Sequence, residues 1–311
     1  MSILVCDIGG TNTRLAFYDA QAAKLNFIQK FRNKDHEHFY DIVRGYLEQV
    51  GKRPSSVVLD LAGPVSAGSG KLTNLDWHIT KADLAEATQC ENVQLLNDLV
   101  AMGMSINLLP SDGLDVIRKG NLSKYDNAQS MVINLGTGFN TCPVIEAPDL
   151  TTFAVEAGHA ATPTDVIELI SKHIGSDRLA DFDTVEKCFA GRRLAGLYGA
   201  LWDTEPMDGA EIARQANAGD ERGIKTLRLF QEMLGLYTGS TALNFLPQRG
   251  IYFAGSVARG ALEFESAKHF LKALNKKRLF QDRIDAMPLK IINLDEAPLL
   301  GCAQTALQQF E

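Results

Sequence analysis

A short apolar strand that ends in a glycine turn occurs twice in this chain, and this repeat constrains the fold more than any other feature. In the first copy the apolar residues 3–5 lead into the segment "CDIGGTNTR" at residues 6–14. In the second copy, residues 131–134 lead into "GTGFNT", and a further apolar strand follows. Asn134 stands where the first copy has Asp7, so only the first turn carries an acid. The repeat predicts two α/β lobes with a cleft between them.

The first glycine turn has two interpretations. One is an ordinary β-hairpin, because a Gly-Gly turn between apolar runs is common hairpin chemistry. The other is a phosphate-binding hairpin. In that case Gly9 and Gly10 let phosphate oxygens approach backbone N–H groups, and Asp7 is directed at a hydrated metal ion.

Strands and helices are expected on both sides of a strong break at residues 108–113. Apolar runs predict strands at residues 2–7, 14–18, 24–30, 56–61, 93–96, 131–134, 142–145 and 250–254. Helices are predicted within residues 36–50, 81–88, 97–106, 163–245 and 298–309. One helical face, formed by Leu227, Phe230, Leu234 and Tyr237, is expected to be core. The predicted lobes are residues 1–108, completed by the C-terminal helix 298–311, and residues 109–297.

Composition narrows the class of protein. The 311 residues are 45% hydrophobic and 22% charged, with a net charge of -7, which is typical of a globular chain. The absence of a dense basic cluster argues against a nucleic-acid partner. No apolar stretch approaches the roughly 20 residues of a membrane span, and residues 1–6 already form a strand pattern, so neither a membrane partner nor a signal peptide is expected.

The numbers and spacing of the cysteines and histidines indicate the expected cellular compartment and the expected kind of metal site. The five cysteines are odd in number and lack C-x-x-C spacing, which argues against a disulfide framework and structural zinc. A reducing cytoplasm is therefore the expected location. The six histidines also lack metal-ligand spacing. Any metal is expected to be Mg²⁺, held mostly by water and phosphate.

Two familiar nucleotide-binding motifs are not supported. Residues 68–71, "GSGK", resemble part of a P-loop, but Leu72 follows the lysine where serine or threonine is required. No G-x-G-x-x-G occurs anywhere in the chain, so the sequence gives no support to a dinucleotide-binding fold.

Asn97 and Asp98 lie where a predicted strand meets a predicted helix. Either residue can serve as a helix N-cap, which is worth about 1 kcal/mol. Alternatively, an acid at the carboxyl end of a strand lies where open α/β sheets bind their ligands. Asp98 in that place can accept a proton from a hydroxyl group.

Several further polar residues are candidates for contact with a sugar. Glu156 and His159 lie three residues apart, and together they can satisfy the donors and acceptors of a sugar diol. The alternative is a surface acid beside a loop histidine. Glu186 would by itself be an exposed helix residue, and Asn74 is a weak candidate when taken alone.

Eight segments in order form a recognisable pattern. They are "DIGGTNTRLA", "LAGPV", "LTNLDW", "LLNDLVAMGMSI", "GTGF", "EAGH", "VEKCFAG" and "FAGSVARG". The chain resembles the bacterial-type glucokinases of the sugar kinase/hsp70/actin superfamily over nearly its whole length. The resemblance implies two ribonuclease-H-like lobes of the actin-type ATPase kind with an interlobe cleft.

The resemblance also implies a role for each matched residue. Asp7 corresponds to the acid near Mg²⁺, which it would hold through water, and Asp98 corresponds to the general base. The residues matched to the hexose site are Asn74, Asn97, Asp98, Glu156, His159 and Glu186. The residues matched to phosphate and adenosine contacts are Gly9, Gly10, Thr11, Asn12, Gly136, Thr137, Gly138, Gly255 and Ser256.

The expected function is ATP-dependent phosphorylation of glucose at its 6-hydroxyl, with Mg²⁺ as cofactor. The alternatives are a kinase for another hexose, or a sugar-binding sensor with weak or no phosphotransferase activity. The resemblance implies a homodimer, although the sequence shows no clear interface. This chain departs from the family's second phosphate turn, where Asn134 and Asn140 replace the outer glycines. It also has Arg192-Arg193 within the segment where the family tends to have S-G-P-G.

Overall fold

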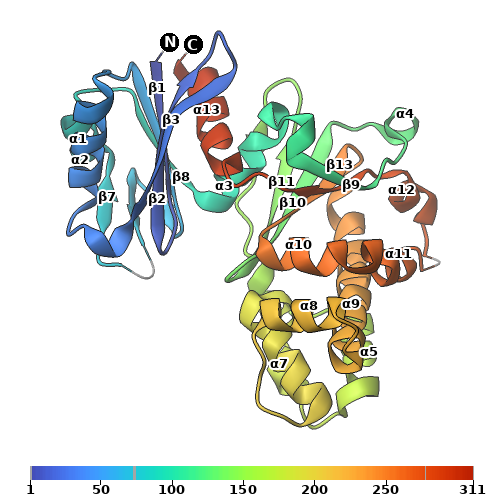
Figure 1. Ribbon diagram of the computed structural model, residues 1–311. Coiled ribbons are helices and arrows are strands. Elements are labelled where there is room, and N and C mark those ends of the chain that lie inside the picture. The colour runs from blue at the N-terminus through green and yellow to red at the C-terminus, as the bar shows by residue number, and fades with distance from the viewer. Residues whose placement is uncertain (1, 73–74, 277, 311) are drawn as a thin grey trace. The chain divides into compact units, whose positions relative to one another are not determined.

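The computed structural model describes residues 2–72, 75–276 and 278–310 (Figure 1). The chain forms two compact units. The first contains residues 1–111, 149–152 and 294–311, and the second contains residues 112–148 and 153–293. Within the described residues, no helix is both long enough and apolar enough to cross a membrane.

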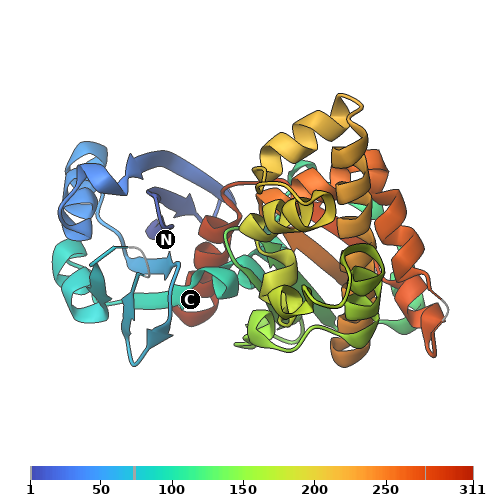
Figure 2. The same ribbon diagram turned by 90° about the horizontal axis from the view of Figure 1, so that it is seen from below.

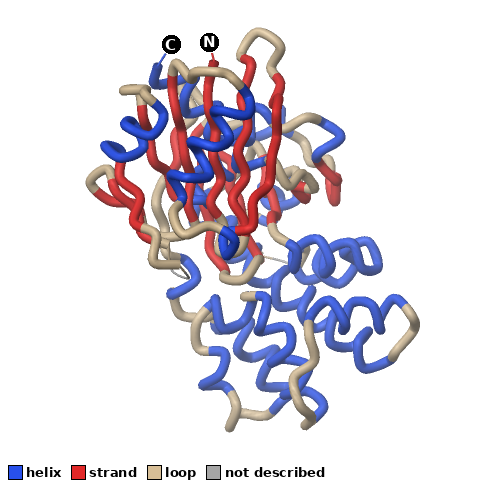
Figure 3. The backbone as a smooth tube through the Cα atoms, turned by 60° about the vertical axis from the view of Figure 1, so that its left-hand side comes forward, coloured by secondary structure: helices blue, strands red, loops and turns tan. Residues whose placement is uncertain are grey.

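The first unit is built on a mixed five-stranded sheet, whose strands lie side by side in Figure 3. Its strand order is β3 (Lys24–Arg32), β2 (Asn12–Asp19), β1 (Ser2–Ile8), β4 (Ser56–Leu61) and β8 (Val93–Asn97). Strands β1, β4 and β8 are parallel, so their carboxyl ends share one edge of the sheet. Strand β2 returns antiparallel to β1 and forms the predicted hairpin.

Helices cover both faces of this sheet, which explains why β1 is an almost continuous apolar run. Helices α1 (Phe39–Val50) and α2 (Lys81–Thr88) lie on one side, and α13 (Ala297–Phe310) lies on the other (Figure 1). Alternate residues of β1 enter different cores: Leu4 packs with the α1 side, whereas Ile3 packs with the α13 side. Helix α3 (Asp98–Met104) begins directly after β8 and packs against α13.

A small antiparallel sheet in the first unit was not predicted. It comprises β5 (Val65–Ser66), β6 (Ser69–Lys71) and β7 (His78–Thr80). Ala67 and Gly68, between the first two strands, both have positive φ values, of 49° and 78°. This is the backbone requirement of a tight hairpin turn. The "GSGK" segment is therefore part of a hairpin and not a phosphate loop. The first unit also contains the two-residue strand β12 (Thr151–Thr152).

The second unit repeats the hairpin of the first, as predicted. Strand β10 (Gln129–Leu135) pairs antiparallel with β11 (Phe139–Ile145), and it runs parallel to β13 (Gly250–Ala254). Two strands missed by the sequence analysis complete the sheet: β14 (Leu289–Ile292) and β9 (Leu114–Arg118). The carboxyl ends of β10 and β13 lie together, so the glycines that follow each strand are neighbours.

Helices make up most of the rest of the second unit, and their colours run from green to red in Figure 2. They are α4 (Leu122–Tyr125), α5 (Thr164–Ile174), α6 (Val185–Phe189), α7 (Gly191–Trp202), α8 (Gly209–Asn217), α9 (Glu221–Phe245), α10 (Ser256–Glu263), α11 (Lys268–Leu274) and α12 (Gln281–Ala286). The predicted apolar face of α9 is confirmed as core: Leu227, Phe230, Leu234 and Tyr237 are all buried. The five cysteines are buried free thiols.

Candidate active site

The first glycine turn lies at the carboxyl end of β1 and is held closed by hydrogen bonds. The Gly9 N–H donates to the carbonyl oxygen of Asn12 at 2.9 Å. The buried side chain of Asn33 stabilises the turn. Its Nδ2 donates a hydrogen bond to the Gly9 carbonyl oxygen, and its Oδ1 accepts one from the Thr13 hydroxyl, each at 2.9 Å. Gly10 and Thr11 are exposed at the tip. The turn therefore presents a fixed backbone to solvent.

Asp7 lies at the base of this turn and is almost fully buried. Its Oδ2 accepts a hydrogen bond from Arg14 Nη1 at 2.9 Å, across the β1–β2 hairpin. Burial raises the pKa of Asp7, while the hydrogen bond and charge of Arg14 act in the opposite direction. Asp60 is the neighbour of Asp7 on β4. Burial, followed by the charges of Asp7 and Asp98, raises the pKa of Asp60 well above its usual value.

The acid at the start of α3 lies on the same edge of the sheet. Asn97 is the N-cap of this helix, because its Oδ1 accepts the Leu99 N–H at 3.0 Å. Asp98 Oδ1 accepts hydrogen bonds from the same N–H and from Asn97 Nδ2, both at 2.9 Å. Burial is the main cause that raises the pKa of Asp98 to about 6, and the charge of Asp7 adds to it. Asn97 and Asp98 thus share the first free N–H of the helix, and both of these hydrogen bonds to Asp98 fall on Oδ1.

In the second unit, two of the three sugar-site candidates lie on one short turn. Glu156 precedes a 3₁₀ turn (Ala157–His159), and the His159 N–H donates to the Glu156 carbonyl at 3.1 Å. Asn140 on β11 orients this turn, since its Nδ2 donates to Glu156 Oε2 at 3.2 Å and its Oδ1 accepts the Ala157 N–H at 3.0 Å. A Cβ atom on Gly158 would lie 2.3 Å from the Phe139 carbonyl oxygen. The absence of a side chain there lets the turn lie against β11.

The second glycine turn follows β10 and lies close to two other segments of the second unit. The Gly136 N–H donates to the Gly138 carbonyl at 3.0 Å. A Cβ atom on Gly138 would lie 3.6 Å from Glu186 Oε2, so the third sugar-site candidate is beside this turn. A Cβ atom on Gly255 would lie only 2.2 Å from the Leu135 carbonyl oxygen, and Gly255 has a φ of 94°. Ser256 then opens α10.

The predicted residues thus fall into two groups, one in each unit. Asn74 lies outside the described residues. The sequence analysis missed Asn33 and Asn140, which brace the two turns, and it missed Arg14 as the partner of Asp7. A signal existed for Arg14, because a hairpin closed at Gly9 and Asn12 places Arg14 opposite Asp7 in the register.

A tight protein cage for a metal ion is not evident. Among the described residues, no group of three or more histidine, cysteine or acidic side chains could hold one. Asp7 supplies a single carboxylate beside the exposed first glycine turn. This donor set fits Mg²⁺, which commonly keeps several waters and takes only one or two carboxylates together with substrate phosphates.

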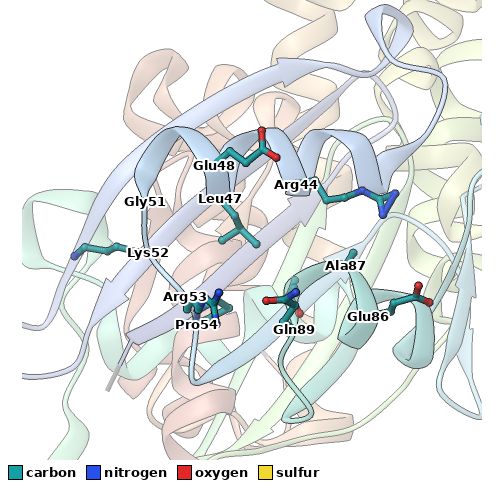
Figure 4. A pocket seen from close by; sticks show the side chains of 11 residues that line it. Arg44, Leu47, Glu48, Gly51, Lys52, Arg53, Pro54, Glu86, Ala87 and Gln89 are labelled. Atoms are coloured by element: carbon teal, nitrogen blue, oxygen red, sulfur yellow. The ribbon is translucent and has the colours of Figure 1, made fainter.

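A separate cavity of about 540 Å³ lies between the C-terminal ends of α1 and α2 (Figure 4). Charged residues of both signs line it, among them Arg44, Arg53 and Glu86. Its residues 51–54 lead into the beginning of β4, and residue 89 precedes β8. It is therefore at the amino ends of these strands, whereas Asp7 and Asp98 lie at the carboxyl ends.

Comparison with known proteins identifies the family of this chain. The sequence model of the Glucokinase family matches residues 4–309. A glucokinase of Hahella chejuensis is 28% identical over 98% of this chain and 97% of that protein. The crystal structure of a glucokinase from an Antarctic psychrotroph has a TM-score of 0.87 at 27% identity, and it covers 99% of both chains. A glucokinase of Balamuthia mandrillaris in complex with glucose shares the fold, with a TM-score of 0.76 at 18% identity over 99% of this chain and 93% of that one.

Proposed function

The chain belongs to the glucokinase family, and we propose that it transfers the γ-phosphoryl group of ATP to the 6-hydroxyl of glucose with Asp98 as general base. Family membership supports the reaction, the sugar and ATP as co-substrate. The observation that carries the role of Asp98 is its location: it is a largely buried acid at the carboxyl edge of the sheet whose pKa is raised to about 6.

A pKa near 6 suits a base that works at neutral pH. About nine-tenths of such a group is ionised at pH 7, and it binds a proton more strongly than an ordinary aspartate does. The hydrogen bonds from Leu99 N–H and Asn97 Nδ2 both fall on Oδ1. They hold the carboxylate in one orientation, so that Oδ2 can accept the proton of the 6-hydroxyl.

The proposed transfer is a single displacement at the γ-phosphorus. The bond between the sugar's 6-oxygen and the γ-phosphorus forms, the bond from that phosphorus to the bridging oxygen breaks, and ADP leaves. The hydroxyl proton passes to Asp98. Phosphoryl transfer requires mainly positioning and neutralisation of charge from the protein. Bound Mg²⁺ would contribute charge neutralisation at the phosphates, with Asp7 holding it through water.

We assign sugar binding to residues of both units. Asn97 and Asp98 belong to the first unit, and the second unit contributes the acid–histidine turn and Glu186. The bracing of Glu156 by Asn140 supports this role, since a carboxylate that is fixed before the ligand arrives orients a hydroxyl at lower entropic cost. The proposed hexose contacts are Asn74, Asn97, Asp98, Glu156, His159 and Glu186.

The nucleotide is assigned to the glycine turns. Each turn follows a parallel strand, which is where α/β sheets bind ligands. The proposed phosphate and adenosine contacts are Gly9, Gly10, Thr11, Asn12, Gly136, Thr137, Gly138, Gly255 and Ser256. We further propose that the lobes 1–108 with 298–311 and 109–297 act as the two halves of a cytoplasmic enzyme that forms a homodimer.

A sugar-binding sensor is the second candidate, and the altered second phosphate turn favours it. Asn134 and Asn140 stand where the family pattern has glycines. A coupled assay of ADP release over a panel of hexoses separates the two functions. We expect turnover with glucose to exceed turnover with the other hexoses. Glucose binding without ADP release above the glucose-free blank would favour the sensor and contradict the kinase.

A further inference from the structure

Helix α7 begins against the second glycine turn. The Gly191 N–H donates to the Gly136 carbonyl oxygen at 2.8 Å. A Cβ atom on Gly191 would also lie 2.8 Å from that oxygen, so a larger residue would push the helix away. The first turn of α7 is thus fixed beside the backbone to which the proposed function assigns phosphate.

Two arginines occupy this first turn, at a place where positive charge is unfavourable. The N-terminus of a helix carries partial positive charge and is stabilised by acids. Helix α7 has no acidic residue in its first turn, and no side chain caps it through a hydrogen bond. Arg192 and Arg193 therefore add positive charge to a helix end that already favours an anion.

The two arginines differ in their surroundings. The Nε atom of Arg193 is buried and lacks a hydrogen-bond partner among the described residues. Its charge also lowers the pKa of the buried Cys188 thiol, against the larger effect of burial. The Arg192 side chain, in contrast, is 73% exposed. Arg192 is the member of the pair that can reach a ligand from solvent.

Arg192 is only loosely held by the protein. Its Nη2 lies 3.8 Å from Glu186 Oε1, which is an ion-pair distance but too long for a hydrogen bond. The other carboxylate oxygen, Oε2, is 3.6 Å from where a Cβ of Gly138 would lie. Guanidinium, carboxylate and glycine turn therefore form one cluster within the second unit.

We propose that Arg192 binds the terminal phosphoryl group of ATP at the Gly136–Gly138 turn and neutralises its charge during transfer. The inference rests on the proposed function, because it takes this turn to be a phosphate site. A guanidinium binds phosphate oxygens through two parallel hydrogen bonds, which makes phosphate a better partner than a carboxylate at 3.8 Å. Arg192 then leaves Glu186, which becomes free to accept a hydrogen bond from the sugar.

The test compares three variants with the parent enzyme. Arg192→Gln removes the charge, and Arg192→Lys keeps the charge but not the planar fork. Arg214→Gln is the matched control, because Arg214 on α8 is also mostly exposed and is paired with Glu211 of the same helix. Dissociation constants for ATP, ADP and AMP are measured calorimetrically with Mg²⁺ and without glucose. Steady-state kinetics give kcat and the KM for ATP.

For Arg192→Gln we expect ATP to bind about tenfold or more weakly, since a charge-assisted contact of this kind is lost. Binding of ADP and AMP should stay within about twofold of the parent, because neither carries a γ-phosphoryl group. The kcat should also fall. Arg192→Lys should recover part of both losses, and Arg214→Gln should resemble the parent.

Parental ATP affinity and parental kcat in Arg192→Gln would overturn the inference. An equal loss of ADP affinity would also overturn it, since the contact would then be to an inner phosphate. These outcomes differ from failure of the proposed function, in which the parent itself releases no ADP with glucose. Thermal unfolding of each variant identifies a folding defect. Should Arg192→Gln not fold, a parental ATP affinity in Arg192→Met would overturn the inference in the same way.

Discussion

The pH dependence of turnover is expected to report the ionisation of Asp98. Burial and the charge of Asp7 raise its pKa to about 6, against the lowering effect of the Leu99 and Asn97 hydrogen bonds. An aspartate with an ordinary pKa, near 3.9, would stay ionised down to about pH 5. With a pKa of about 6, only about one-tenth of the base is ionised at pH 5. The kcat/KM for glucose should therefore be flat above about pH 7 and fall about tenfold per unit below pH 6.

The substitution Asp98→Asn removes the proton acceptor and keeps the shape. The amide oxygen can still accept the Leu99 N–H, so we expect glucose affinity within about tenfold of the parent. The kcat should fall by about 10² or more, and the remaining activity should lose its dependence on pH between 5 and 7. The assay is coupled ADP release at saturating ATP, with glucose titration calorimetry at each pH as the control for binding.

Two results would refute this reasoning. The first is a parent profile that stays flat to pH 5 while the protein remains folded, because the base would then have an ordinary pKa. The second is a near-parental kcat in Asp98→Asn, because a group that cannot take a proton would then suffice.

The same pKa has a consequence for stability. Because the pKa of Asp98 is raised in the folded state, its contribution to stability is fully present below about pH 4 and is lost as pH rises through about 6. At pH 8 the ionised group costs about 1–3 kcal/mol. Asp98→Asn should therefore unfold at a higher urea concentration than the parent at pH 8, and the gain should vanish near pH 4.

Five other substitutions test the proposed site and the packing around it. Asp7→Ala should bind glucose like the parent, melt within a few degrees of it and lose most of its Mg²⁺-ATP-dependent turnover, whereas Asn134→Ala should lose far less turnover. The measurement is steady-state kinetics at several Mg²⁺ concentrations. Parental turnover of Asp7→Ala at low Mg²⁺ would mean that "CDIGGTNTR" is only a structural hairpin. Gly255→Ala should destabilise the protein by about 3 kcal/mol or more, because its Cβ would lie 2.2 Å from a carbonyl oxygen. Gly196→Ala in the interior of α7, where nothing lies within 4 Å, should be neutral or stabilising by about 0.5–1 kcal/mol in urea unfolding. Asp60→Asn should retain kcat within a fewfold at pH 7, because burial and the charges of Asp7 and Asp98 raise the pKa of Asp60 and so favour its neutral form, which an amide resembles. A large loss of kcat would mean that the ionised form of Asp60 is needed.

Long apolar runs and periodic segments were predictable from the sequence. The strands at 56–61 and 250–254 and the helix at 81–88 coincide residue for residue with the structure. The helix expected from residue 36 begins at Phe39, because His38 still has an extended backbone. A strand that is buried on both faces is continuously apolar, and this pattern can be recognised in the sequence without knowing which strands lie beside it.

The missed elements lacked such a pattern. Strands β5, β6 and β7 have two or three residues each, which is too short for alternation to be visible. Strand β9 lies at a sheet edge and carries exposed residues, so its pattern is weak. The bracing of Gly9 by Asn33 joins residues 24 apart in sequence, and no local propensity encodes such a contact.

The two glycine turns have a similar backbone arrangement, but only the first has an acid at its base. At the first, Asp7 is held by Arg14, and this pairing keeps a buried acid beside an exposed glycine turn. At the second, Asn134 lies where its Oδ1 would be 2.9 Å from a Cβ on Gly255, so this side chain fills space beside a second glycine. An acid at Asn134 would have no such arginine opposite it, because its partner in the register is Asn140. The neutral residue there leaves attraction for phosphate to the backbone, to the first turn of α7 and, in our proposal, to Arg192.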